Sequence, residues 1–130
     1  MAHVVLLHSV LGLRAAERAI AAAFEADGHA VALPDLYAGR SAEGFRLKDE
    51  VGDALIQARA RAALAAAPAD AVLAGVSLGT FLVGAFWGER SHMPGALLLS
   101  GFAPWTDHDA AAATLCLERC RAFLRTIEER

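Results

Sequence analysis

Four short apolar runs alternate along the chain with four longer segments in which apolar residues recur every three or four positions. The runs are HVVLLH (3–8), HAVALPD (29–35), AVLAGVS (71–77) and GALLLSGF (95–102). They lack the polar alternation of a half-exposed strand, so each predicts a strand that is buried on both faces. Pro34 is expected to end the second strand, because proline cannot donate to the hydrogen-bond ladder of a sheet.

The first longer segment predicts an amphipathic helix. Its apolar face comprises Leu13, Ala16, Ile20 and Phe24. The charged residues between them are expected to face elsewhere: Arg14, Glu17, Arg18 and Glu25. Gly28 follows, and a glycine in the left-handed conformation is a common way to end a helix.

Three more helices are expected. The second runs from Asp49 to Ala66, and its predicted apolar side comprises Val51, Leu55, Ala58, Ala62 and Ala65, with Arg59 and Arg61 outside. Residues 78–90 predict a third helix that is apolar almost all round and therefore buried. The last helix is expected from about Asp107 to Ile127, with Thr106 or Asp107 as its cap. Its predicted buried stripe is Ala113, Leu117, Cys120, Leu124 and Ile127.

Strands and helices therefore alternate from one end of the chain to the other. This alternation predicts an α/β fold, in which a parallel sheet of about four strands carries helices on both faces through right-handed crossovers. A length of 130 residues fits one domain, residues 1–130.

Composition narrows the functional classes. The net charge is −3 and the basic residues do not cluster, so nucleic acid is not an expected partner. Cys116 and Cys120 lie four residues apart, and we interpret them as small apolar core residues in a reducing cytoplasm rather than as a disulfide or metal site. The amino terminus has no basic segment before its apolar run, so no signal peptide is expected. No cofactor is expected either.

The stretch between Asp70 and Glu89 contains eighteen uncharged residues, which raises the question of a membrane helix. A span needs about twenty apolar residues in one continuous helix. Gly75, Ser77, Gly79 and Gly84 interrupt this stretch, and its first half has the pattern of a strand. We therefore expect a buried strand followed by a helix, and no membrane association.

The sequence GVSLG (75–79) matches the pattern G-x-S-x-G directly after a predicted strand and directly before a predicted helix. In that context the pattern indicates a nucleophile elbow, a sharp turn that exposes the serine hydroxyl above the sheet. The amide of Leu78 would donate to an oxyanion, with a second donor from the loop around Ser9 and Val10. The alternative is a glycine-rich turn with an incidental serine.

Beyond this motif, most of the chain resembles the dienelactone hydrolase family of α/β-hydrolases, especially its bacterial members with a serine nucleophile. The resembling segments are VVLLHSVLGLR, ADGHAVALPDLYAGRS, DEVGDALI, AVLAGVSLGTFLV, GALLLSGFAPW and AAATLCLERCRAFL. The resemblance implies a three-layer sandwich with strand order 2-1-3-4, Ser77 as the nucleophile and the amide of Val10 as the second oxyanion donor.

The chain is shorter than that family pattern. In the family the catalytic acid follows the next strand, and the catalytic histidine follows one strand later. Here only residues 103–106 separate the fourth predicted strand from the last helix, so neither segment has a counterpart.

A serine hydroxyl needs a base, and five histidines are available. His8 ends the first strand and Asp35 ends the second, so a relay Asp35–His8–Ser77 across adjacent strand tips is one hypothesis; alternatively, His8 orders the oxyanion loop and Asp35 caps the turn before Tyr37. His108, flanked by two aspartates, is the other candidate base, or else an ordinary exposed residue at a helix start. His3, His29 and His92 fall at the wrong end of the sheet.

Three residues are candidates for substrate binding: Ser9, Arg40 and Trp105. The edge of the fourth strand would be exposed and could support a homodimer. We therefore expect a small serine hydrolase acting on esters, lactones or thioesters. The alternative is a catalytically inactive remnant of a hydrolase that binds a ligand or another subunit. Nucleotide binding is disfavoured, because no G-x-G-x-x-G follows the first strand.

Overall fold

The computed structural model describes residues 1–40, 46–90, 92–99 and 110–128. In chain order its elements are β1 (His3–Leu7), α1 (Ala15–Ala26), β2 (Ala30–Ala32), α2 (Arg46–Val51), α3 (Asp53–Ala66), β3 (Val72–Val76), α4 (Leu78–Phe86), the 3₁₀ turn η1 (Trp87–Glu89), β4 (Ala96–Leu99) and α5 (Ala110–Glu128). The predicted alternation of strands and helices is confirmed.

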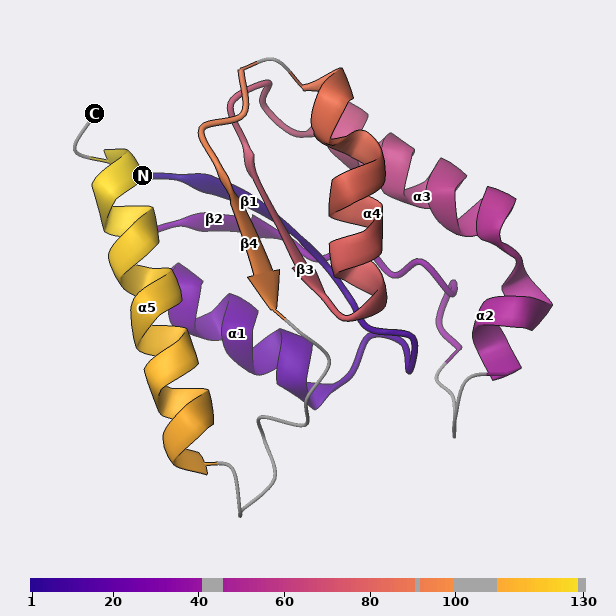
Figure 1. Ribbon diagram of the computed structural model, residues 1–130, viewed down its shortest axis with the longest axis horizontal. Coiled ribbons are helices and arrows are strands. Elements are labelled where there is room, and N and C mark those ends of the chain that lie inside the picture. The colour runs from indigo at the N-terminus through magenta and orange to yellow at the C-terminus, as the bar shows by residue number, and fades with distance from the viewer. Residues whose placement is uncertain (41–45, 91, 100–109, 129–130) are drawn as a thin grey trace.

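The strands form one parallel sheet in the order β2-β1-β3-β4 (Figure 1). Val4 of β1 lies opposite both Val31 of β2 and Val72 of β3, so β1 has a hydrogen-bonded neighbour on each side. All five residues of β3 are buried, as the continuous apolar pattern predicts. The fold class and the predicted strand order are therefore confirmed.

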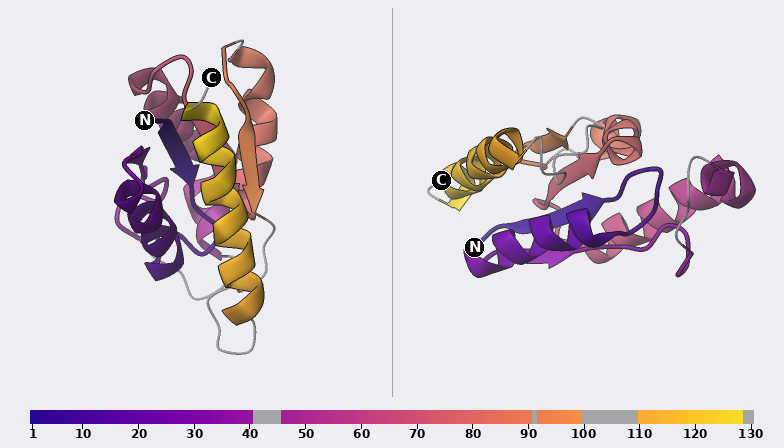
Figure 2. Two further views of the ribbon diagram at one scale, coloured as in Figure 1. Left: turned by 90° about the vertical axis from the view of Figure 1, so that its left-hand side faces the viewer. Right: turned by 90° about the horizontal axis from the view of Figure 1, so that it is seen from below.

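Helices cover both faces of the sheet and enclose two apolar layers (Figures 1 and 2). On one face, α1 and α5 contribute Ile20, Phe24 and Leu124 to a cluster with Val4 and other strand residues. On the other face, α2, α3 and α4 pack against the strand side chains that point the opposite way. That second cluster includes Val5, Leu7, Leu73, Leu47, Ile56, Leu64 and Phe86. The arrangement is a three-layer sandwich.

The helix predicted from Asp49 to Ala66 is in fact two helices, α2 and α3. Gly52 separates them with φ of 87°, a conformation that favours glycine. The predicted apolar side of this segment was also wrong: Ile56, Ala60 and Leu64 are buried, while Leu55 is 45% exposed. Alanines occur all around α3, so its sequence distinguishes the two sides only weakly. Because an alanine side chain has little apolar area, leaving it exposed to solvent costs little free energy on either side of the helix.

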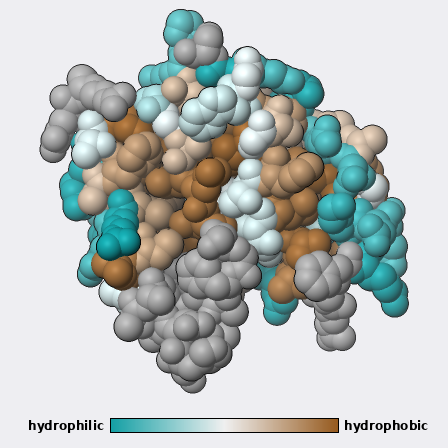
Figure 3. Space-filling view, in the orientation of Figure 1, coloured by the Kyte–Doolittle hydropathy of each residue, from teal (hydrophilic) through white to brown (hydrophobic). Residues whose placement is uncertain are grey.

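The composition of α4 predicted a helix buried on all sides, but the structure shows that only one side is buried. Leu82, Val83 and Phe86 face the sheet, but Phe81 is 72% exposed and Trp87 in η1 is 53% exposed. On the edge strand β4, Leu98 is 63% exposed. Figure 3 shows the face of the molecule that carries β4 and α4, and hydrophobic residues are exposed across the middle of this face. One side of α4 packs on the sheet, and its outer side lacks a layer among the residues that the structure describes.

The predicted stripe of α5 is confirmed where its side chains are described. Cys120 and Leu124 are buried, and Leu117 and Ile127 pack against the same cluster. Burial raises the pKa of Cys120 to about 12, so its thiol stays protonated. The expected cap residues Thr106 and Asp107, and the Ala113 side chain, lie outside the described part.

An ion pair joins α5 to the end of α1. Arg121 donates to both carboxylate oxygens of Asp27, at 2.6 and 2.5 Å, and this hydrogen bonding lowers the pKa of Asp27 below its usual 3.8. A carboxyl group whose pKa is lower in the folded state than in the unfolded state stabilises the fold at pH values above its unfolded-state pKa. That stabilisation is lost as the pH falls through its folded-state pKa. The contact therefore makes stability depend on pH.

Asp27→Asn is expected to lower the free energy of unfolding at about pH 6, and to have a smaller effect at about pH 2, because the stabilisation from a carboxylate with a lowered pKa is lost as the pH falls. Urea denaturation at the two pH values measures this difference. Asp70→Asn, at an exposed position, is the control and should change little at either pH. Equal destabilisation by Asp27→Asn at both pH values would show that the ion pair is not the cause.

Candidate active site

Ser77 stands alone between β3 and α4 in a backbone conformation that serine rarely adopts. Its φ is 54° and its ψ is −105°, so it belongs to neither the strand nor the helix. Its N–H donates to the carbonyl of Leu99 at 2.9 Å, and its own carbonyl accepts from the N–H of Thr80 at 2.9 Å. These two bonds tie the residue to β4 and to the first turn of α4. The sharp strand-to-helix turn predicted at this residue is present.

The glycines on either side of Ser77 are required by space. A Cβ atom on Gly75 would lie 2.2 Å from the backbone carbon of Gly79, and one on Gly79 would lie 2.1 Å from the carbonyl oxygen of Leu7. Real Cβ atoms do not approach backbone so closely. The start of α4 therefore rests directly on β3 and β1, which forces the turn at Ser77.

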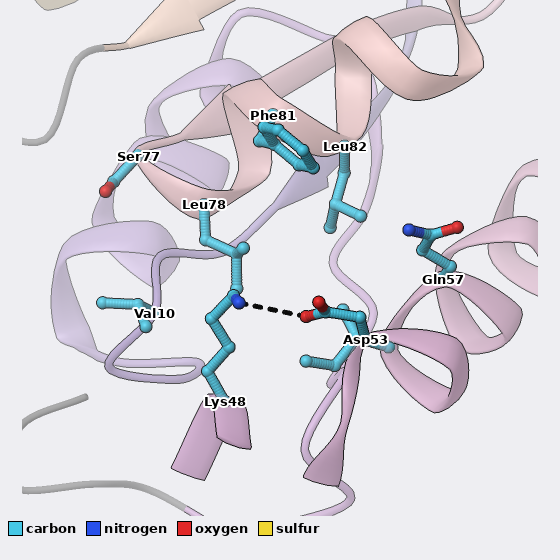
Figure 4. A pocket seen from close by; sticks show the side chains of 9 residues that line it. Val10, Lys48, Asp53, Gln57, Ser77, Leu78, Phe81 and Leu82 are labelled. Atoms are coloured by element: carbon cyan, nitrogen blue, oxygen red, sulfur yellow. Dashed lines mark ion pairs between the residues drawn. The ribbon is translucent and has the colours of Figure 1, made fainter. Parts of the chain in front are cut away.

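Ser77 lies at the carboxyl ends of the strands, beside the point where the strand order reverses between β1 and β3. Open parallel sheets bind ligands at such a position. A cavity of about 460 Å³ is present here, lined by Val10, Lys48, Asp53, Ile56, Gln57, Ser77, Leu78, Phe81 and Leu82. Figure 4 shows Ser77 at one end of it, with Oγ turned away from Lys48 and Asp53. No described residue forms a hydrogen bond with the Ser77 hydroxyl.

Two backbone amides next to this cavity are available as oxyanion donors. Leu78 is the first residue of α4, so its N–H has no carbonyl one turn earlier in the helix. The N–H of Val10 likewise donates to no acceptor within the described ranges. Both residues line the cavity with Ser77. The predicted pair of donors therefore borders the same space as the serine.

The loop that carries Val10 is held by its own hydrogen bonds. Gly12 N–H donates to the carbonyl of Ser9 at 3.0 Å, and Leu11 N–H donates to Ser9 Oγ at 3.3 Å. The hydroxyl of Tyr37, a fully buried residue, donates to the carbonyl of Val10 at 2.8 Å. The Ser9 hydroxyl, expected to contact substrate, thus supports the turn of the loop.

Glu17 is a support of this loop that the sequence pattern missed. It was expected to face away from the apolar side of α1, yet it is only 2% exposed. One carboxylate oxygen accepts from Ser9 N–H and the other from Arg14 N–H, both at 3.2 Å. Glutamate is favoured three positions after a helix cap because it accepts from free amides there. The position of Glu17 three residues after Arg14 was therefore the sequence signal that could have predicted this contact.

His8 does not form the hypothesised relay with Ser77. It is fully buried, its Nδ1 donates to the carbonyl of Ser9 at 2.7 Å, and its Nε2 accepts from Leu36 N–H at 3.0 Å. Asp35 accepts from two other amides, those of Tyr37 and Gly39, at 3.0 and 2.8 Å. Both ring nitrogens and the carboxylate are thereby engaged with backbone. The alternative geometry is the one observed: His8 holds the loop that carries Ser9 and Val10, and Asp35 caps the turn that contains Tyr37.

The remaining predicted residues lie elsewhere. Arg40 does not line the cavity; it pairs with Glu50, and this pairing lowers the pKa of the Glu50 carboxyl. His3, His29 and His92 precede or open strands, so they lie at the opposite end of the sheet from Ser77. His108 and Trp105 fall outside the described residues.

Polar residues from α2 and α3 line the cavity without having been predicted. Lys48 Nζ lies 3.0 Å from Asp53 Oδ1, and both side chains project into the cavity together with Gln57 (Figure 4). No motif marked these residues, because the helix pattern had placed a different side of this segment against the protein. Only the break at Gly52, which separates α2 from α3, brings Lys48 back toward Asp53.

Comparisons with protein-family models, with curated proteins and with solved structures each found no match. Among the residues that the structure describes, no group of three or more His, Cys, Asp and Glu side chains could hold a metal ion. Within the same residues, no helix is both long and apolar enough to cross a membrane. What the site can do therefore rests on a serine hydroxyl, two free amides and an adjoining cavity.

Proposed function

We propose that the protein is a small serine hydrolase that acts on esters, lactones or thioesters, with Ser77 as the nucleophile. The observation that carries this proposal is the conformation of Ser77, at φ of 54° between two obligatory glycines and open to a cavity. Strained residues of this kind concentrate at functional sites. The resemblance to dienelactone hydrolases supports the same assignment.

The reaction uses groups that border one space. Ser77 Oγ attacks the carbonyl carbon of the substrate, and the N–H groups of Leu78 and Val10 donate to the oxyanion that forms. Collapse of that intermediate releases the alcohol or thiol and leaves an acyl group on Ser77. Water then attacks the acyl carbonyl, the bond to Ser77 Oγ breaks, and the carboxylic acid leaves as Oγ regains its proton. This chemistry needs no cofactor, and the free thiols Cys116 and Cys120 fit a cytoplasmic setting.

Proton transfer from Ser77 requires a base. His8 has both ring nitrogens engaged, and three other histidines lie at the far end of the sheet. His108 is therefore the candidate base of this proposal. In the chain it comes nine residues after Leu99, whose carbonyl accepts the Ser77 N–H.

A second candidate function is binding without turnover. The observation that favours it is that the Ser77 hydroxyl has no hydrogen-bond partner among the described residues, so no described group activates it. In this case the cavity binds a small ligand, and the exposed Leu98 on edge strand β4 supports pairing with a second copy. Analytical ultracentrifugation measures that pairing.

Covalent labelling distinguishes the two functions. The purified chain is expected to react with a fluorophosphonate probe at Ser77, as located by mass spectrometry of the labelled peptide. It is also expected to release nitrophenol from a short nitrophenyl ester, and labelled protein should lose that activity. His108→Ala should abolish ester turnover, whereas His92→Ala, at an exposed position at the far end of the sheet, should not.

A folded but unlabelled protein without ester turnover supports binding alone. Labelling of Ser77 combined with full turnover in His108→Ala would exclude His108 as the base while retaining the nucleophile.

A further inference from the structure

The cavity beside Ser77 has one apolar wall and one charged pair. Leu78, Phe81 and Leu82 from α4 and Ile56 from α3 present aliphatic and aromatic surface. Beside them, Lys48 of α2 and Asp53 of α3 form an ion pair 3.0 Å apart. The lining thus contains both a positive and a negative group that could contact the same bound molecule.

The ion pair makes this part of the cavity electrically balanced. The Lys48 side chain is 35% exposed and already has a carboxylate partner, so a second carboxylate would have to compete for it. Asp53 is 69% exposed and would repel such a competitor. Asp53 is also the first residue of α3, where the helix dipole stabilises a negative charge. An anionic ligand would therefore gain little attraction from Lys48, whose charge is already paired, and would be repelled by the carboxylate of Asp53.

We propose that the cavity accepts uncharged apolar groups and excludes anionic ones, with Asp53 as the residue that determines this preference. Resting on the proposed function, the inference means that Ser77 acts on esters whose acyl part is uncharged. Lys48 then serves to hold Asp53 at the cavity rather than to bind substrate. The apolar wall next to Ser77 supplies the favourable contact with the acyl chain.

Binding of two unreactive amides tests this preference without requiring turnover. The probes are N-methylhexanamide and the monomethylamide of adipate, which has the same chain with a terminal carboxylate. Dissociation constants come from NMR titration of the wild-type chain, Asp53→Asn and Asp49→Asn. Wild type is expected to bind the neutral probe about tenfold more tightly. Asp53→Asn frees the Lys48 charge and should remove that difference.

Asp49→Asn is the matched control, because Asp49 is exposed on α2 and does not line the cavity. It should behave as wild type. The double variant Lys48→Met with Asp53→Asn removes both charges and should restore the preference for the neutral probe. Asp53→Asn removes the charge and nearly keeps the side-chain volume, and the double variant also removes the charge of Lys48. These results together therefore attribute the preference to charge rather than to volume.

Equal or tighter binding of the anionic probe by wild type would overturn the inference, as would failure of wild type to bind either probe. An identical response of Asp53→Asn and Asp49→Asn would also overturn it. Repeating the titration with Ser77→Ala separates this inference from the proposed function. A retained preference without any fluorophosphonate labelling of wild type would leave the cavity assignment standing and reject the nucleophile alone.

Discussion

Replacing Gly79 by alanine is expected to destabilise the protein by about 3 kcal/mol, because the added methyl group would overlap backbone rather than a flexible side chain. Its Cβ would lie 2.1 Å from the carbonyl oxygen of Leu7 and 2.8 Å from the carbonyl carbon. Relief requires α4 to move away from β1, which opens the apolar layer beneath the helix. Urea denaturation of the variant and of wild type measures the loss.

Gly84→Ala provides the matched control in the same helix. Nothing lies within 4 Å of a Cβ at Gly84, and the position is exposed. Alanine stabilises a helix interior by about 1 kcal/mol relative to glycine, so this variant should be more stable than wild type. If Gly79→Ala were as stable as Gly84→Ala, the close approach of α4 to β1 would be incorrect.

Removing the Ser77 hydroxyl is expected to reduce ester turnover by a factor on the order of 10³ or more, if Ser77 is the nucleophile. Two substitutions separate chemistry from strain. Ser77→Ala retains a side chain at φ of 54° and should keep wild-type stability. Ser77→Gly relieves the positive φ and should raise the free energy of unfolding by about 1 kcal/mol, after the greater entropy of glycine in the unfolded chain is subtracted.

The measurements are nitrophenyl ester hydrolysis and thermal or urea unfolding of all three proteins. Comparable turnover in wild type and Ser77→Ala would contradict the assignment of the nucleophile. A Ser77→Gly variant that is less stable than Ser77→Ala would contradict the backbone strain at this turn. The two results are independent, because the first concerns the oxygen atom and the second concerns the backbone.

The hydrophobic pattern predicted the layers of the fold better than the faces of its helices. A strand that is buried on both sides, such as β3, leaves a continuous apolar run that few other elements produce. α3 leaves no such signal, because alanine is tolerated on either side of it. The strand order followed from the family resemblance, since local patterns do not specify which strands become neighbours.

The candidate site divides in a similar way. Ser77 and the amide of Leu78 could be predicted, because a short motif between a strand and a helix specifies local backbone, whereas the amide of Val10 was implied by the family resemblance. The Lys48–Asp53 pair could not be predicted, because its role depends on contacts formed after the chain folds, and the only signal for Glu17 was its spacing from Arg14. The Asp35–His8–Ser77 relay failed for the same reason: strand order brings residues near, but hydrogen bonds decide where an imidazole points.

The position of β1 has a consequence for how the chain is made. β1 pairs with β2 across fewer than thirty residues, but Val4 pairs with Val72 on its other side, 68 residues later. A ribosome therefore releases the first strand, its helix and its early neighbour well before the partner that completes its hydrogen bonds. Until β3 emerges, the apolar centre of the future sheet has one open edge, and nascent chains must pass through this state before the turn at Ser77 can form.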